Sequence, residues 1–181
     1  MNKIQFGLAL IGICAASTSS FSSEGTISFE GKLVSGTCSP SVGGGGASST
    51  VTLPTLNTSS LLTANSTAGA KAFEIILEDG DDDPGCASDG KYATPYFEYD
   101  AAKVDANGRL INTATDGAEN VVIQLLNNTN TPIDLVKDLN SQITSTASDN
   151  TTYKYTARYF ATGPAGAGPV SGSISYSFIY K

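Results

Sequence analysis

The side chains in this sequence considered first for chemistry are carboxylates and cysteines. The chain contains no histidine. Without histidine, nucleophilic machinery of the Ser-His or Cys-His kind is excluded, and the commonest metal ligand is missing. A pair of carboxylates could in principle catalyse glycoside hydrolysis, with Glu74, Glu98 and Glu119 as candidates. Nothing in the sequence pairs them, so we predict a protein that is not an enzyme and has no catalytic residue, metal or cofactor.

An acidic segment from Glu78 to Gly85 reads Glu-Asp-Gly-Asp-Asp-Asp-Pro-Gly. Its carboxylate oxygens are the ligands that Ca²⁺ prefers, but their spacing does not match the helix-flanked calcium loop. A solvated acidic loop is therefore the favoured interpretation. The formal net charge of −7 also argues against nucleic acid as a partner, because binding phosphates requires basic patches.

The first 17 residues have the pattern of a secretory signal peptide. Lys3 supplies a positive charge, an uncharged and mostly apolar run extends from Ile4 to Ala16, and the small residues Ala15-Ala16-Ser17 suit a cleavage site. The apolar run is too short to span a bilayer as a helix. We therefore expect an exported protein whose mature chain begins near Thr18.

The expected export determines how the cysteines are interpreted. Cys14 lies within the signal peptide, and lipid attachment there is disfavoured because the bulky Ile13 precedes it. Its removal leaves Cys38 and Cys86, and an even pair in an exported chain predicts a disulfide. Closing the long loop between them would stabilise the fold by about 4 kcal/mol.

The rest of the chain has the pattern of one all-β domain. Short apolar or alternating runs are separated by clusters of Gly, Pro, Asn, Asp and Ser, and none sustains helical periodicity. Val121 to Leu126 is almost continuously apolar, as in a central strand covered on both faces. Gly43 to Gly46 is a flexible loop that lacks the Lys-Ser/Thr of a phosphate-binding loop. The spacing suits a β-sandwich, with strands expected at Thr26–Val34, Thr50–Leu53, Ala72–Leu77, Pro95–Tyr99, Asn120–Leu126, Tyr153–Ala161 and Val170–Tyr180.

The C-terminal run alternates apolar and small polar residues up to the last positions. On a strand, its large side chains fall on one face and its serines on the other. Because terminal residues usually fray, this pattern predicts that the strand is captured, either by the chain's own sheet or by a partner. The residues of the apolar face are Ile174, Tyr176, Phe178 and Tyr180.

Four segments of the chain carry a further signal. They are Gly25–Val34 followed by Cys38, Asn120–Asn127 followed by Thr131-Pro132-Ile133, Ala157–Gly163, and the Tyr-rich C-terminus. In this order, they resemble the major fimbrial subunits of the chaperone-usher pathway, of the type 1 pilus kind. Together they span nearly the whole mature chain, although the glycine run and the acidic segment lengthen the loop between the cysteines and leave the fimbrial type open.

The resemblance implies an incomplete immunoglobulin-like β-sandwich that lacks its last strand and is completed in trans by donor-strand exchange. Residues 18–30 would be the donor extension and residues 31–181 the pilin domain. Donor residues would be Phe21, Gly25, Ile27 and Phe29, with Gly25 matching a small residue of the family's extension. The alternative is that Phe21 to Phe29 is an ordinary first strand of its own domain. The acceptor groove would be lined by the apolar face of the C-terminal strand.

The function implied is that of a structural subunit of an adhesive fimbria, exported through the periplasm to the cell surface. Its implied partners are neighbouring copies of the chain, a periplasmic chaperone and an outer-membrane usher, and we expect no direct contact with a host receptor. Two alternatives stay open. One is a minor adaptor subunit, and the other is a secreted, monomeric carbohydrate-binding β-sandwich with Tyr92, Tyr96 and Tyr99 as stacking surfaces.

Overall fold

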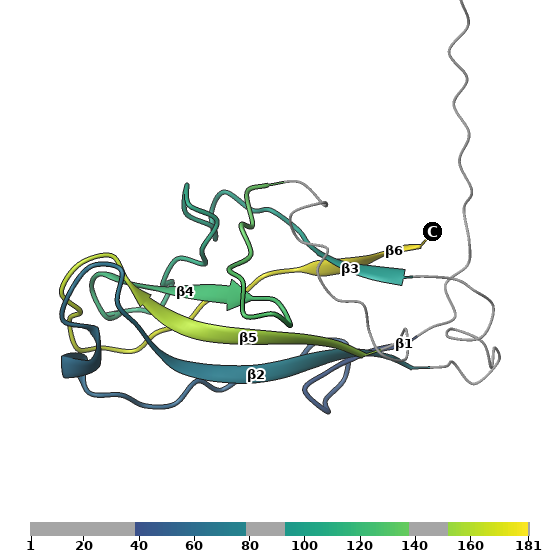
Figure 1. Cartoon of the computed structure of the whole chain (residues 1–181), viewed down its shortest axis with the longest axis horizontal. Helices are drawn as coiled ribbons and strands as arrows, with labels where there is room; N and C mark the ends of the chain where they lie inside the picture. The colour runs from purple at the N-terminus through teal and green to yellow at the C-terminus, as the bar shows by residue number, and fades with distance from the viewer. Residues whose placement is uncertain (1–38, 79–92, 138–151, 181) are drawn as a thin grey trace, which may run out of the picture. The chain divides into compact units, whose positions relative to one another are not determined.

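The computed structural model describes residues 39–78, 93–137 and 152–180, which form two antiparallel sheets (Figure 1). The predicted all-β class is confirmed, and the one helical element among the described residues is a short 3₁₀ turn. None of them forms a helix long and apolar enough to cross a membrane. The larger sheet has the order β1-β2-β5-β4 and the smaller sheet pairs β3 with β6. The elements are β1 (Ser39–Val42), η1 (Thr58–Leu61), β2 (Thr67–Glu78), β3 (Ala93–Phe97), β4 (Val121–Leu126), β5 (Thr152–Ala161) and β6 (Tyr176–Tyr180).

Most of the predicted strands inside the described residues are confirmed, with differences at their ends. β4 and β5 lie within one residue of their predicted bounds, whereas β3 begins and ends two residues earlier than predicted. β2 begins earlier than predicted, at Thr67, because a register shift between Ala68 and Lys71 lets its pairing with β5 continue past Gly69. The short β1, which pairs with the end of β2, was not predicted. The strand expected at Thr26–Val34 lies outside the described residues.

Two of the expected strands differ from the structure in whether, or over what length, they pair with a neighbour. Thr50–Leu53 forms no strand, and the C-terminal run pairs as a ladder only from Tyr176 onward. The ladder is short because its partner β3 has only five residues. Both stretches nevertheless border the site described below.

β4 is buried along its whole length, as its apolar sequence predicts. It is the last strand in its sheet rather than a central one, and its outer edge is covered by irregular segments. Leu110 and Ile123 exchange backbone hydrogen bonds of 2.9 Å, and the Ile133 amide donates to the Leu125 carbonyl. These bonds satisfy the backbone groups that an exposed edge would leave unpaired.

The core lies between the two sheets and is rich in aromatic rings. The Tyr155 ring on β5 stacks on Phe73 of β2, with centroids 5.5 Å apart, and meets Phe97 of β3 edge-on at 5.2 Å. Tyr153 on β5 lies 5.9 Å from Phe178 of β6. Since each buried aromatic contributes about 2 to 3 kcal/mol of hydrophobic stabilisation, these contacts join the sheets into one sandwich.

Candidate functional site, a groove beside the C-terminal strand

Residues 170–180 form one wall of the candidate site. Their side chains alternate as predicted: Ile174, Tyr176 and Phe178 pack against the core, whereas Ser173 and Ser175 are exposed. The period-2 arrangement therefore begins well before the hydrogen-bonded strand β6.

The backbone of this wall is paired on one side only. The Ser171 carbonyl accepts a hydrogen bond from the Thr113 amide (2.8 Å), and the Ser175 carbonyl accepts one from the Glu98 amide (2.9 Å). Because backbone groups of successive residues on a strand point to opposite sides, those of Gly172 and Ile174 face the other edge. Within the described part of the chain, nothing hydrogen-bonds to them.

Residues 47–56 form the opposite wall. Their side chains also alternate, with Val51 and Leu53 half-buried and Thr50 and Thr52 exposed, which is the pattern that predicted a strand there. The segment has no strand partner among the described residues. No backbone group of this segment bonds to another backbone group of the described residues, although two of its carbonyls accept hydrogen bonds from tyrosine hydroxyls.

Two cavities lie between these walls, one after the other along them. The larger, of about 720 Å³, has residues 47–51 on one side and 171–176 on the other, and Ile75, Ile123 and Leu125 in its lining. The smaller, of about 440 Å³, has residues 55–58 on one side and 165–170 on the other. We call the two cavities together the groove.

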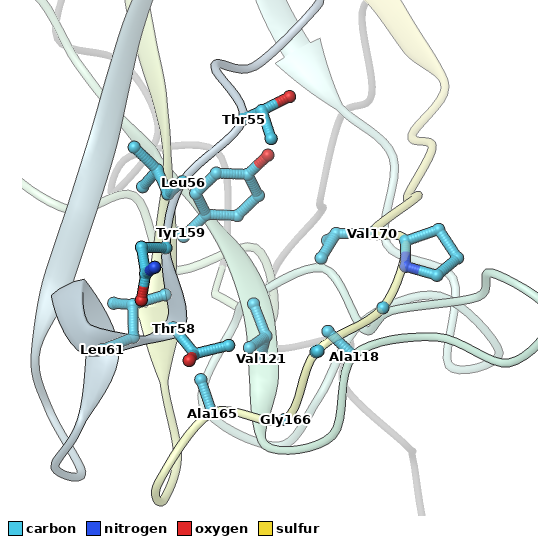
Figure 2. A pocket seen from close by; sticks show the side chains of 14 residues that line it. Thr55, Leu56, Thr58, Leu61, Ala118, Val121, Tyr159, Ala165, Gly166 and Val170 are labelled. Atoms are coloured by element: carbon cyan, nitrogen blue, oxygen red, sulfur yellow. The ribbon is translucent and has the colours of Figure 1, made fainter.

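The smaller cavity has one apolar side and one side of small residues (Figure 2). Leu56, Leu61 and Tyr159 line it from the side of η1 and β5. The facing stretch from Ala165 to Pro169 reads Ala-Gly-Ala-Gly-Pro, so few side-chain atoms fill the space. This end of the groove has room for a bulky side chain supplied from outside.

The described residues that line the groove carry no charge. Its polar side chains are hydroxyls and an amide, and burial raises the pKa of both Tyr159 and Tyr176, so their hydroxyls stay protonated donors near neutral pH. Charged groups such as the Lys154–Glu74 pair, 3.7 Å apart, lie elsewhere, on β5 and β2. An uncharged apolar groove with an unpaired backbone edge on each side suits an extended apolar strand.

The predicted groove residues are only partly brought together. Ile174 and Tyr176 line the larger cavity, while Phe178 packs against the core beyond it. Tyr180 belongs to β6, but its side chain lies outside the described residues. Other expected site residues also lie outside them, namely Cys38, Cys86, Phe21, Gly25, Ile27 and Phe29. The acidic segment from Asp79 to Gly85, which is predicted to be a solvated loop, lies outside them as well.

Sequence reasoning missed the wall at residues 47–56 and the small-residue stretch at 165–169. The alternation of Val51 and Leu53 was a signal for the first, although it indicated a paired strand. The second carries no periodic pattern. Its role follows only from its position beside the smaller cavity.

The three glutamates considered as catalytic candidates lie at different places in the fold. Glu74 on β2 pairs with Lys154, whereas Glu98 follows β3 and Glu119 precedes β4. Of the tyrosines considered for carbohydrate stacking, Tyr96 is half-buried, Tyr99 is exposed and Tyr92 lies outside the described residues.

Comparisons with known proteins show the family to which the chain belongs. The model of the family described as "Fimbrial protein" matches residues 27–181. The F17 fimbrial protein of Escherichia coli is 38% identical over 100% of both chains, and the major fimbrial subunit SMF-1 of Stenotrophomonas maltophilia is 36% identical over 93% of this chain and 99% of its own.

Among solved structures, the chain is similar to an antigen and type I fimbria protein of Burkholderia pseudomallei. The TM-score is 0.52 at 26% identity, over 74% of this chain and 83% of that chain. The two-sheet sandwich is accordingly the immunoglobulin-like pilin fold. This chain belongs to the fimbrial protein family and is a structural subunit of an extracellular fimbria, exported through the periplasm.

Proposed function

We propose that the subunit polymerises by donor-strand exchange, in which residues 18–30 of one copy fill the groove of the next. The observation that supports this most strongly is the pair of unpaired backbone edges, at residues 47–56 and at 170–176, that face each other across apolar cavities. A single strand between them could pair with both edges at once. It would complete the sandwich as the missing strand.

The predicted donor segment has the pattern that such a groove requires. Phe21, Gly25, Ile27 and Phe29 fall on one face of an extended chain, so their side chains would enter the groove in turn. Each large apolar side chain buried in this way would contribute about 2 kcal/mol. Gly25 would lie where the donor backbone approaches the subunit closely, as in the family's extension.

The groove also argues for the partners that the family implies. Apolar cavities and unpaired strand edges favour association with other chains. We infer that a periplasmic chaperone covers the groove before assembly and that an outer-membrane usher guides the exchange. In the finished fibre, a neighbouring copy of the same chain takes the chaperone's place.

A complementation experiment tests the proposal. Deleting residues 18–30 gives a chain that can accept a donor strand but supplies none. Replacing Ala167, an exposed residue lining the smaller cavity, by tryptophan gives a chain that supplies a donor strand but whose groove is blocked. Neither variant should polymerise alone. Their mixture should give dimers and nothing longer.

The control places the same bulk away from the groove. Ala101→Trp, in the exposed turn after β3, should polymerise like the unmodified chain. The products are measured as ladders on denaturing gels without heating, with each variant carrying a different tag. Normal fibres from the deletion variant would contradict the proposal.

A further inference from the structure

We propose that Tyr159 and Tyr176 are positioning residues that hold the wall at residues 47–56 at the width of one strand. The inference rests on the proposed function, since it concerns how the groove is kept open for a donor strand. It starts from the way in which this wall is attached to the rest of the domain.

The wall has few hydrogen bonds of its own. Among the described residues, its only hydrogen bonds to the rest of the sandwich are two that its carbonyl oxygens accept from tyrosine hydroxyls. The Tyr176 hydroxyl donates to Ala47 (2.8 Å), and the Tyr159 hydroxyl donates to Pro54 (3.2 Å). One bond lies near each end of the wall, so the two together fix its course.

The wall is attached to the chain through two local structures. Before it, the turn after β1 is closed by hydrogen bonds between Val42 and residues 45 and 46, with positive φ angles at Gly43 and Gly44. After it, the Asn57 side chain caps the 3₁₀ turn η1. Between these anchors the backbone is unpaired, and side-chain packing of Leu53 supplements the two tyrosine bonds.

Tyr176 joins the two walls directly. It lies on the C-terminal wall, and its hydroxyl reaches the other wall at Ala47. Two strands that flank a missing one are separated by two strand spacings, or about 10 Å. A tyrosine side chain extended by one hydrogen bond has a reach of this order, so the bond is compatible with a gap for one inserted strand.

Tyr159, on β5, holds the other end of the wall. Its ring lies against Gly69, at the bulge of β2, and beside Leu56 of the wall. Its hydroxyl then reaches Pro54. The bulge thus positions the ring, and the ring contacts the part of the wall that borders the smaller cavity.

A wall held in its binding position loses less conformational entropy when a strand binds, which strengthens binding. Removing one hydroxyl should weaken that hold by the net value of one hydrogen bond. We expect each loss to shorten the residence time of a bound strand by about fivefold. Losing both should shorten it by about 25-fold if the two act independently.

The experiment uses the mature chain and a fluorescent peptide of residues 18–30. The peptide is bound, an excess of unlabelled peptide is added, and the rate of release is measured for Tyr159→Phe, Tyr176→Phe and the double variant. Tyr96→Phe is the matched control, since Tyr96 lines neither cavity and no described group bonds to its hydroxyl. Urea unfolding of each variant is measured in parallel.

Faster release of the peptide from Tyr159→Phe and from Tyr176→Phe, with the control unchanged, supports the inference. Release at the unmodified rate would overturn it, even if the urea midpoint falls, because a merely structural role lowers stability without changing residence time. If the unmodified chain does not bind the peptide at all, the proposed function itself fails. The two failures are therefore distinguishable.

Discussion

The ring of Tyr159 lies directly against the backbone of Gly69, so closely that a Cβ atom at Gly69 would be 2.8 Å from Cδ2 of the ring. The same Cβ would be 3.0 Å from Cδ1 of Leu56. Gly69 has a φ of 67° and marks the bulge in β2. One glycine thus places an aromatic ring of β5 next to a wall of the groove.

Replacing Gly69 by alanine should therefore destabilise the domain. The left-handed backbone costs an L-residue about 1 to 2 kcal/mol, and the displaced Tyr159 ring adds to that. We expect a loss of about 2 kcal/mol or more in the free energy of unfolding, measured with urea. Gly46→Ala is the control, because a Cβ there would meet nothing within 4 Å. Equal effects of the two substitutions would contradict this account.

The apolar face of the C-terminal strand should contribute more to the free energy of unfolding than its polar face. Phe178 packs against the core, and its ring centroid lies 5.9 Å from those of both Tyr153 and Tyr176. Its replacement by alanine removes these contacts and should cost about 3 kcal/mol in urea unfolding. Ser173→Ala, on the exposed face, should change the free energy of unfolding by less than about 0.5 kcal/mol. A similar loss in both variants would show that the alternation does not decide the packing.

Arg158 and Gln124 should behave as a coupled pair. The Arg158 Nε and Nη2 atoms donate to the Gln124 Oε1 at 3.0 and 2.7 Å, and Gln124 is only 8% exposed. Arg158→Met leaves this buried carbonyl without its donors and should cost about 2 kcal/mol.

The double variant with Gln124→Met should cost less than the sum of the two single variants, because no buried acceptor is left unpaired. Urea unfolding of all four proteins gives the coupling energy. Strict additivity would mean that the contact contributes nothing specific to stability.

Stability should fall at alkaline pH. Burial, with a smaller contribution from nearby Tyr153, raises the pKa of Tyr155 well above its ordinary value of 10.0. The folded state therefore keeps a proton that the unfolded chain releases, so stability is fully present below about pH 10 and declines as the pH rises further. The urea midpoint should therefore fall progressively as the pH rises above about 10.

Tyr155→Phe should make that decline shallower, since the variant has no hydroxyl to titrate at this position. Tyr99→Phe is the matched control, because Tyr99 is 49% exposed. The prediction fails if both variants lose stability with the same slope as the unmodified chain.

Much of the fold follows from local patterns in the sequence. The unbroken apolar run of β4 and the alternation of β5 predicted both strands and their buried faces, since burial of a strand depends on its own side chains. The same reasoning placed Ile174 and Tyr176 on the inner face of the C-terminal wall. The resemblance to fimbrial subunits added the expectation of a missing strand.

The groove itself was decided by tertiary structure. Val51 and Leu53 alternate like a strand, but no local feature states whether a neighbouring strand pairs with them. The Tyr176–Ala47 bond joins residues far apart in the chain, and the seat of Tyr159 at Gly69 depends on the register of β2 against β5. A sequence pattern fixes which face of a strand is buried, whereas its neighbours, and the edge left without one, depend on contacts between distant segments.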